Sequence, residues 1–529
     1  MSVEQLKKDI IEGYRFNGGS IIMGAGRIGD EILTDHLVRI PLKTLNRHGL
    51  IAGATGTGKT KTLQIIAEQL STNGIPCLLM DIKGDLSGIA KIADENPKFI
   101  ERHDKIGLPY IPDSSPVEFL SLSDEVGVRL RATVSEFGPV LFSKILDLND
   151  TQGGVISLLF KWCDDNQLPL LDLDDVKKAL QYLTNEGKDA IKAEYGSISS
   201  TTVGTIMRKI IELEQQGANV FFGEVSFDPD DLCRLDSSGK GMVSILRVTD
   251  LQDRPKLFST FMLQILAEIY STFPEEGDLD KPKLCIFIDE AHLVFNEASK
   301  VLQDQIETII KLIRSKGVGI FFCTQNPTDI PDSVLSQLGL KVQHALRAFT
   351  AKDRKAIKMA AENFPYTTHY AVDELLTSMG IGEAMITALN EKGIPTPLVH
   401  TFLRAPQSRM DILTQRELDD IIFRSMIVPK YQNKIDRESA YDILSGKIEE
   451  AQSEQIQEEL RRQNEMARPS SSGRQEKSTF EKVINNSTTR SIGTAVAKEI
   501  TRGLLGVLGI KTTTRRTTST RKKSVFPWF

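Results

Sequence analysis

Short, fully apolar runs alternate along the chain with longer segments in which apolar residues recur every three or four positions. The runs are HGLIA, IPCLLMD, GMVSILRV, KLCIFID and GVGIFFCT. Each has the length of a buried strand and lacks the alternation of a half-exposed one. Buried strands that alternate with helices are typical of a parallel sheet covered on both faces. The sequence therefore predicts an α/β fold.

Three of the intervening segments place their apolar residues on one face of a helix. They follow the first, third and fourth runs, so each helix connects two predicted strands. The stripes consist of Leu63, Ile66, Ala67 and Leu70; of Phe258, Phe261, Met262, Ile265, Leu266 and Ile269; and of Leu302, Ile306, Ile309, Ile310 and Ile313.

The regions on either side of this core have different patterns. Short apolar runs and glycines between Tyr14 and Ile40 indicate small strands and turns, whereas the residues beyond Arg404 are helical and charged. The predicted segments are an N-terminal β unit (1–45), an α/β core (46–405) with a mostly helical insertion at about 101–240, a helical extension (406–466), a linker (467–479), an amphipathic helix (480–510) and a basic tail (511–529).

The amphipathic helix near the C-terminus has an apolar residue at every fourth position. These residues are Ile492, Val496, Ile500, Leu504 and Leu508. Three interpretations stay open: the stripe docks subunits within a ring, it binds an anionic membrane surface, or it packs on the chain's own core.

Composition narrows the class of protein. Apolar and charged residues make up 40% and 26% of the 529 residues, as in soluble globular proteins. The net charge of −6 is uneven, because the segment from Arg468 onward holds 13 Lys and Arg against 3 Asp and Glu, a net +10 that leaves −16 for the rest. The sequence shows no secretory signal, no apolar run long enough to span a membrane and no paired cysteines, so we expect a cytoplasmic protein.

A glycine-rich loop between the first strand and its helix matches the pattern G-x-x-x-x-G-K-[ST]. Its residues are Gly53, Ala54, Thr55, Gly56, Thr57, Gly58, Lys59 and Thr60. In this pattern the backbone N–H groups surround the phosphates, the lysine reaches the β and γ oxygens, and the threonine hydroxyl binds Mg²⁺. The loop therefore predicts binding of ATP with Mg²⁺.

Two carboxylates follow the apolar run of 284–288. Asp289 is expected to hold Mg²⁺ through water, and Glu290 to act as the general base that orients and deprotonates an attacking water. Two further polar side chains end strands, namely Asp81 and Gln325. Both are expected near the γ-phosphate because ligands bind at the carboxyl ends of parallel strands. The alternative for both is a polar residue that only caps a strand.

Phosphoryl transfer also uses arginine charge near the leaving group, often from another subunit. The candidates are Arg47, just before the P-loop strand, Arg314, at the end of the helix after the acidic pair, and Arg347. The alternative for each is a solvated surface charge.

Taken in order, the segments GATGTGKT, MDIKGDLSG, FIDEAHLVF, FFCTQNPTDIP and HALRAFTAKD resemble the HerA/FtsK superfamily of ring-forming, DNA-pumping ATPases. The resemblance extends from about His48 to Arg404. It is closest to the stand-alone bacterial HerA-like proteins of the YjgR type.

The resemblance implies a RecA-like P-loop ATPase that forms a homohexamer around double-stranded DNA. It implies that Asp81 assists in the active site, that Gln325 is a γ-phosphate sensor and that Arg314 is a trans-acting arginine finger. It further implies that Arg47 acts in cis. We add Arg347 as a further arginine candidate, which is expected on the strand after the sensor. Only about 45 residues precede the P-loop, so a nuclease partner is not expected.

Three functions are compatible with the sequence. The first is a translocase that threads duplex DNA and touches its phosphates without reading sequence. The second is an ATPase that drives a protein or secretion substrate. The third is a scaffold whose assembly state is set by bound nucleotide, against which Glu290 counts, because a switch has less need of a general base.

Overall fold

The computed structural model describes residues 3–122, 125–249, 254–277, 279–295, 300–432, 435 and 437–466. The chain forms two units, Met1–Gln452 and Ser453–Phe529. In the second unit, the described residues continue the last helix. The linker, the amphipathic helix and the basic tail predicted for 467–529 lie outside the described residues. No helix within the described ranges is long and apolar enough to cross a membrane.

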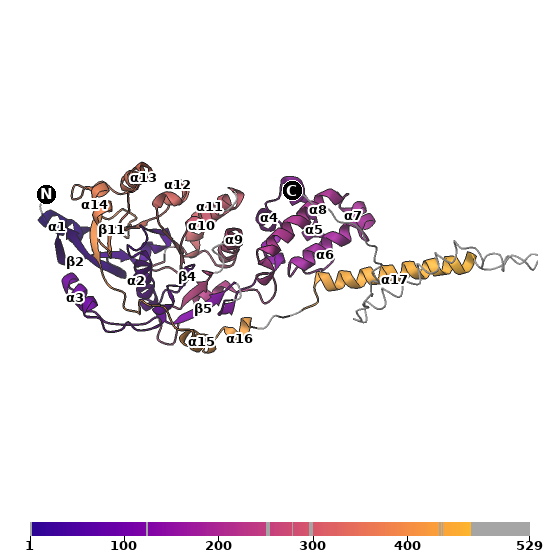
Figure 1. Cartoon of the computed structure of the whole chain (residues 1–529), viewed down its shortest axis with the longest axis horizontal. Helices are drawn as coiled ribbons and strands as arrows, with labels where there is room; N and C mark the ends of the chain where they lie inside the picture. Colours follow the sequence, from indigo (N-terminus) through magenta and orange to yellow (C-terminus); the bar gives the residue numbers. More distant parts are fainter. Residues whose placement is uncertain are drawn as a thin grey trace, which may run out of the picture. The chain divides into compact units, whose positions relative to one another are not determined.

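A single large sheet forms the centre of the first unit (Figure 1). The strands are β1 (Ser20–Ile28), β2 (Glu31–Pro41), β3 (Gly49–Ala52), β4 (Cys77–Asp81), β5 (Val117–Ser121), β6 (Val128–Arg129), β7 (Val243–Arg247), β8 (Leu284–Ile288), β9 (Val318–Thr324), β10 (Leu340–Gln343), β11 (Glu383–Thr387) and β12 (Val399–Leu403). Their spatial order is β2-β1-β12-β11-β10-β3-β9-β8-β4-β7-β5-β6.

The run from β10 to β6 is parallel throughout, whereas β11, β12, β1 and β2 continue the sheet in antiparallel pairs. The carboxyl ends of the parallel strands therefore share one edge. This α/β architecture, a large and mostly parallel sheet flanked by helices, confirms the predicted fold class.

Helices connect the strands and extend the fold. They are α1 (Val3–Gly13), α2 (Lys59–Thr72), α3 (Pro97–Ile106), α4 (Val134–Ile145), α5 (Asp150–Asp165), α6 (Leu173–Thr184), α7 (Lys188–Glu194), α8 (Ser200–Gln215), α9 (Pro255–Thr272), α10 (His292–Phe295), α11 (Lys300–Ile313), α12 (Asp332–Leu335), α13 (Ala351–Glu362), α14 (Val372–Ser378), α15 (Gln415–Phe423), α16 (Val428–Tyr431) and α17 (Ala440–Met466).

Each face of the parallel strands carries its own apolar core. On β8, Ile286 and Ile288 belong to the core that α9 and α11 cover, while Cys285 and Phe287 belong to the core that contains α2. Successive residues of a strand point to opposite faces, so a strand that is apolar at every position requires cover on both sides. The unbroken apolar runs of the sequence follow from this arrangement.

The N-terminal strands are part of the main sheet. β1 pairs with β12 at Gly24–Leu403 and Gly26–Thr401, and β2 pairs with β1. A helix that the glycine pattern did not indicate, α1, precedes them and buries Leu6 and Ile10. The strands predicted there thus exist, and they are the antiparallel end of the sheet.

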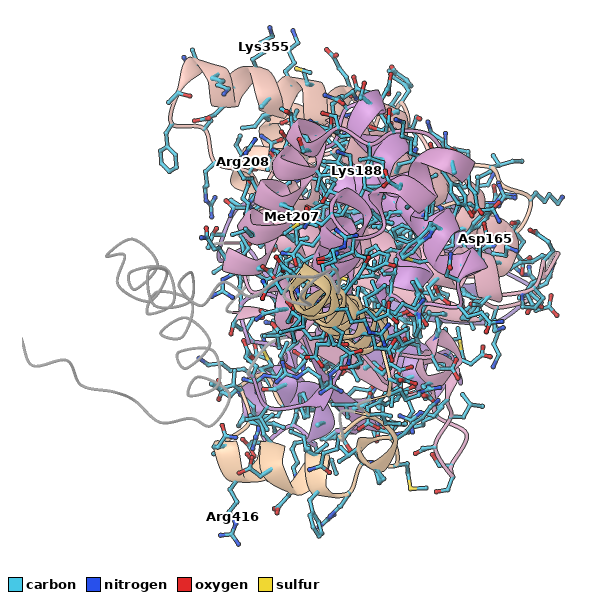
Figure 2. The ribbon with its side chains drawn as sticks, turned by 90° about the vertical axis from the view of Figure 1, so that its right-hand side faces the viewer. Asp165, Lys188, Met207, Arg208, Lys355 and Arg416 are labelled. Atoms are coloured by element: carbon cyan, nitrogen blue, oxygen red, sulfur yellow. The ribbon has the colours of Figure 1, made fainter. Side chains whose placement is uncertain are left out.

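The segment predicted as a mostly helical insertion contains α3 to α8 and two strands. β5 pairs in parallel with β7, so the insertion also adds strands to the sheet edge. α4 to α8 gather beside that edge (Figure 1). Figure 2 looks onto these helices, whose exposed side chains include Asp165, Lys188 and Arg208.

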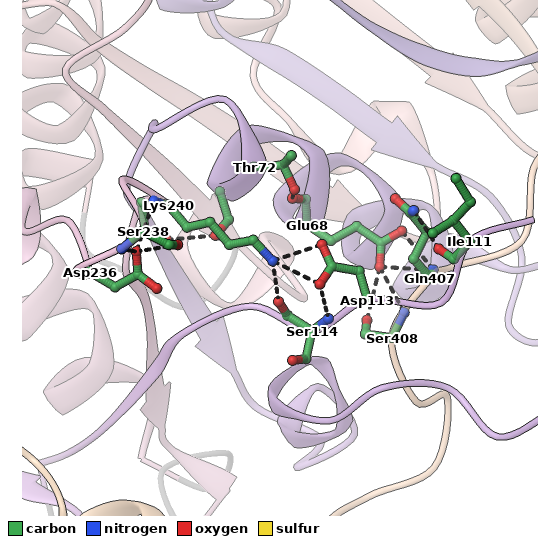
Figure 3. Close-up of polar contacts among 12 residues, drawn as sticks. Glu68, Thr72, Ile111, Asp113, Ser114, Asp236, Ser238, Lys240, Gln407 and Ser408 are labelled. Carbon is green, nitrogen blue, oxygen red and sulfur yellow. Dashed lines mark hydrogen bonds and ion pairs between the residues drawn. The ribbon is translucent and has the colours of Figure 1, made fainter.

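A strap of chain after β12, residues 404–413, crosses the helix α2 that follows the P-loop (Figure 3). The buried carboxylate of Glu68 accepts hydrogen bonds from the N–H of Gln407 (2.8 Å) and from the N–H and hydroxyl of Ser408 (3.2 and 2.9 Å). Burial raises the pKa of Glu68 to about 7, although these hydrogen bonds oppose the shift.

The raised pKa of Glu68 makes the free energy of unfolding depend on pH in a predictable direction. Between about pH 4.5 and 7 the folded chain holds a proton on Glu68 that the unfolded chain has released, so raising the pH favours unfolding. A shift of this size corresponds to about 3 kcal/mol. As the pH rises from 5 to 8, the thermal unfolding midpoint of the wild type should fall relative to the midpoint of Glu68→Gln. Calorimetry of both chains at each pH measures this difference. Parallel pH profiles would contradict the assignment.

Candidate nucleotide-binding site

The glycine-rich loop connects the carboxyl end of β3 to the start of α2. Gly58 is the N-cap of α2, with φ of 110°, and among the described residues no side chain caps it. The first N–H groups of a helix lack partners within the helix. They therefore point, with the positive end of the helix dipole, into the space where a phosphate would lie.

The backbone of this loop is held by the end of β9 and by the segment that follows β10. The N–H of Gly53 donates to the carbonyl of Thr324 (3.2 Å), and the N–H of Ala54 donates to that of Ala345 (2.8 Å). Gly53 has φ of 155°, and an added Cβ would lie 2.5 Å from the Cβ of His344. Only glycine fits there. His344 opens the segment HALRAFTAKD, but no role in the site was predicted for it.

Lys59 is buried and folds back over its own loop. Its Nζ donates to the carbonyls of Gly53 (2.7 Å) and Ala54 (3.3 Å). Burial and the nearby charge of Lys83 lower the pKa of Lys59, and the carboxylates of Glu290 and Asp289 oppose this shift. The lysine therefore lies within electrostatic reach of the acidic pair, as the sequence predicts.

The acidic pair follows β8 at the same edge of the sheet. Asp289 is 3% exposed, and burial raises its pKa to about 6. Glu290 is 6% exposed and has a φ of 46°, a left-handed conformation that is strained for a non-glycine residue. Strained backbone of this kind clusters at functional sites.

The site fits Mg²⁺. In the part of the chain that the structure describes, the buried Oδ2 of Asp289 accepts no hydrogen bond, and a buried carboxylate oxygen without a donor is suited to a cation. The described residues contain no group of three or more His, Cys, Asp or Glu side chains placed to hold a metal. Asp289 and Thr60 are enough protein ligands for Mg²⁺, because this ion usually binds through one or two protein oxygens and completes its coordination with substrate phosphates and water.

Lys83 joins this site, although no sequence motif selects it. Its Nζ forms an ion pair with Glu290 and lies 4.0 Å from Oδ2 of Asp289. Burial lowers the pKa of Lys83, but the two carboxylates together raise it above its ordinary value. The signal was present in the segment MDIKGD, where a lysine follows a strand end that was already assigned to the site.

Asp81 lies at the end of β4, as predicted, but its carboxylate is engaged by its own turn. One oxygen accepts the N–H groups of Gly84 (2.7 Å) and Asp85 (3.1 Å), and the other accepts that of Leu86 (3.1 Å). Burial raises its pKa to about 6. The side chain therefore shapes the turn that carries Lys83, and its role near the γ-phosphate stays a prediction.

Gln325 and Arg347 line one open hollow beside the P-loop, together with Ala54, Thr55 and His292. Gln325 follows β9 directly and is exposed, a position that a γ-phosphate sensor requires. The placement of Arg347 on a strand was wrong, because β10 ends at Gln343 and Arg347 lies in the exposed segment after it.

Arg47 and Arg314 lie at the opposite edge of the sheet. Arg47 ends the 3-10 helix η1 (Leu42–Arg47) before β3, and the exposed Arg314 precedes β9 close to the buried ring of His48. Strands rise about 3.3 Å per residue, so each arginine is roughly 20 Å from the P-loop of its own chain. This placement does not bring Arg47 to the P-loop of its own chain, and its cis role stays a prediction.

The sequence matches one family model over most of its length. That family, described as helicase HerA-like C-terminal, covers residues 28–513. The DNA double-strand break repair helicase HerA of Sulfurisphaera tokodaii is 24% identical over 371 residues, which cover 69% of this chain and 66% of that protein. The protein of the same name from Saccharolobus solfataricus is 23% identical over 366 residues, with the same two shares.

The chain thus spans about 66% of the length of these curated relatives. Among solved structures, the unbound bacterial conjugative coupling protein TrwB superposes with a TM-score of 0.47 and 14% identity. The superposition covers 75% of this chain and 97% of that one.

Proposed function

The chain belongs to the helicase HerA-like C-terminal family, and on this basis we propose that it is a P-loop ATPase motor that hydrolyses ATP with Mg²⁺ between the subunits of a ring. The observation that carries the proposal is the pair Asp289 and Glu290, buried at the strand edge within electrostatic reach of Lys59. The first carboxylate is suited to Mg²⁺, and the second supplies the group that orients and deprotonates an attacking water.

Each residue of the candidate site has a separate role in the proposed hydrolysis. The P-loop N–H groups and Lys59 bind the triphosphate, while Thr60 and Asp289 hold Mg²⁺, whose charge neutralises the phosphate oxygens when bound. Glu290 orients the attacking water and accepts its proton. Gln325 faces the hollow from which the γ-phosphate is approached.

The positions of the arginines support the proposed ring. A head-to-tail contact brings one edge of a subunit against the opposite edge of the next, and such contacts form a ring when the rotation between successive subunits closes. Arg314, exposed at the edge away from its own P-loop, then faces the P-loop of the neighbour. We infer a homohexamer in the cytoplasm, by the resemblance to ring-forming relatives.

The substrate that we propose is double-stranded DNA. The named relatives are DNA double-strand break repair helicases, and a motor that grips the phosphate backbone does not need to read sequence. A protein substrate and a nucleotide-controlled scaffold are the outcomes against which this proposal is tested.

An ATPase titration tests the proposal. Turnover should rise several-fold with duplex DNA, less with single-stranded DNA, and the mass measured in ATP should be that of a hexamer; the stimulation should weaken as salt screens the phosphate contacts. Hydrolysis that long duplex DNA leaves unchanged would exclude the DNA motor and favour a protein substrate. A chain that binds ATP but does not hydrolyse it would favour the scaffold.

A further inference from the structure

Lys83 is the one cation that the structure places against both carboxylates of the site, among the residues described. Its Nζ pairs with Glu290 and lies 4.0 Å from Oδ2 of Asp289, and its side chain is 36% exposed. Both carboxylates are more than nine-tenths buried. Buried carboxylates that lie side by side need a compensating positive charge.

The backbone that carries Lys83 is held in place independently of this ion pair. Asp81 accepts three N–H groups of the following turn, and Gly84 adopts a φ of 74° that allows the chain to reverse. The lysine therefore projects from a fixed turn at the carboxyl end of β4, which pairs with β8 immediately before the acidic pair.

The position of Lys83 sets up a competition for Asp289. A Mg²⁺ ion at Asp289 supplies the charge that the lysine supplies in its absence, and the two cations repel each other at this distance. Lys83 is thereby left with Glu290, its shorter contact. A carboxylate held by a lysine keeps one orientation, which a general base requires.

We propose that Lys83 is a positioning residue of this site: it neutralises Asp289 and Glu290 before Mg²⁺ arrives and holds Glu290 in its working orientation afterwards. The second half of this role rests on the proposed ATPase function, whereas the first half concerns binding only. Lys83 touches no reacting atom, and it acts through the two carboxylates.

The test measures how strongly Mg²⁺ and nucleotide assist each other's binding. The dissociation constant of a fluorescent ADP is measured in EDTA and in Mg²⁺. The constant in EDTA divided by the constant in Mg²⁺ is the coupling factor. In Lys83→Met, nucleotide binding in EDTA should weaken, because phosphates then meet two uncompensated carboxylates, and the coupling factor should rise about ten-fold.

Two further variants keep the test specific. Lys83→Arg retains the charge and should restore the wild-type coupling factor and most of the turnover, and Lys98→Met, an exposed lysine on α3, should change neither. In Lys83→Met the turnover number should fall while the KM in Mg²⁺ stays within a few-fold. Circular dichroism spectra that match the wild type confirm that each variant is folded.

The outcomes separate the two proposals. A coupling factor that is the same in Lys83→Met and in the wild type would overturn the role of Lys83, whatever the turnover. Wild-type chain without hydrolysis, combined with the expected rise in coupling, would overturn the ATPase proposal and leave charge compensation by Lys83 standing.

Discussion

Replacing Glu290 with Gln is expected to lower ATP turnover by roughly 10²- to 10⁴-fold, the usual contribution of a positioned general base. The amide has nearly the shape of the carboxylate but cannot accept the proton of the attacking water. ATP binding should persist, because Lys59 and the P-loop N–H groups are unchanged, so the variant should accumulate bound, unhydrolysed ATP. Single-turnover hydrolysis and filter binding measure the two effects.

Glu362→Gln provides the matched control for this variant. Glu362 is an exposed carboxylate at the end of α13, so the same chemical change there should leave turnover at the wild-type level. Turnover of Glu290→Gln equal to that of the control would refute the base assignment. Loss of ATP binding together with turnover would show instead that Glu290 supports the fold of the loop.

Replacing Arg314 with Ala is expected to lower turnover by about 10³- to 10⁵-fold, the range for a trans-acting arginine finger. The physical reason is that a guanidinium from the next subunit stabilises the charge of the transition state. Arg314 is exposed and lies at the sheet edge away from its own P-loop, so its own site does not need it. Steady-state ATPase rates measure the effect, with exposed Lys311→Ala on α11 as the control.

Mixing the two inactive variants tests whether Arg314 acts in trans. In an equimolar mixture of Glu290→Gln and Arg314→Ala chains, about a quarter of the contacts in a head-to-tail ring pair an intact Glu290 with an intact Arg314 of the neighbour. Turnover should therefore recover on mixing. An unrecovered rate, with mixed assemblies verified by mass, would place the arginine's role within its own chain.

Apolar patterning predicted five of the parallel strands, β3, β4, β7, β8 and β9, but not β5 and β6 of the insertion. Runs such as 284–288 are apolar at every position because helices cover both faces of the sheet. An unbroken apolar run in the sequence therefore indicates a strand that is buried on both faces. The antiparallel strands β11 and β12 were not identified, since five-residue strands joined by irregular segments give no distinctive period. Nor does the sequence indicate that β1 pairs with a strand nearly at the other end of the core.

The candidate site was predictable for the residues that belong to a motif with a known position relative to a strand. The P-loop and the acidic pair each follow a strand, and strand ends share an edge, so their proximity follows from topology. The same rule places residues before a strand at the far edge, which is why Arg47 does not lie beside Lys59. The partners of Asp81 and the ion pair of Lys83 depend on the path of one turn, which spacing does not report.

The order of strands in the sheet also has a consequence for the synthesis of the chain. β3 carries the nucleotide loop, yet its neighbours in the sheet are β9 and β10, which are translated more than 260 residues later. Contacts between residues far apart in sequence form slowly, because the entropy of closing the intervening loop is lost first. The loop of 53–60 therefore leaves the ribosome long before the strands that give it shape, and its ability to hold a nucleotide reports that nearly the whole core has folded.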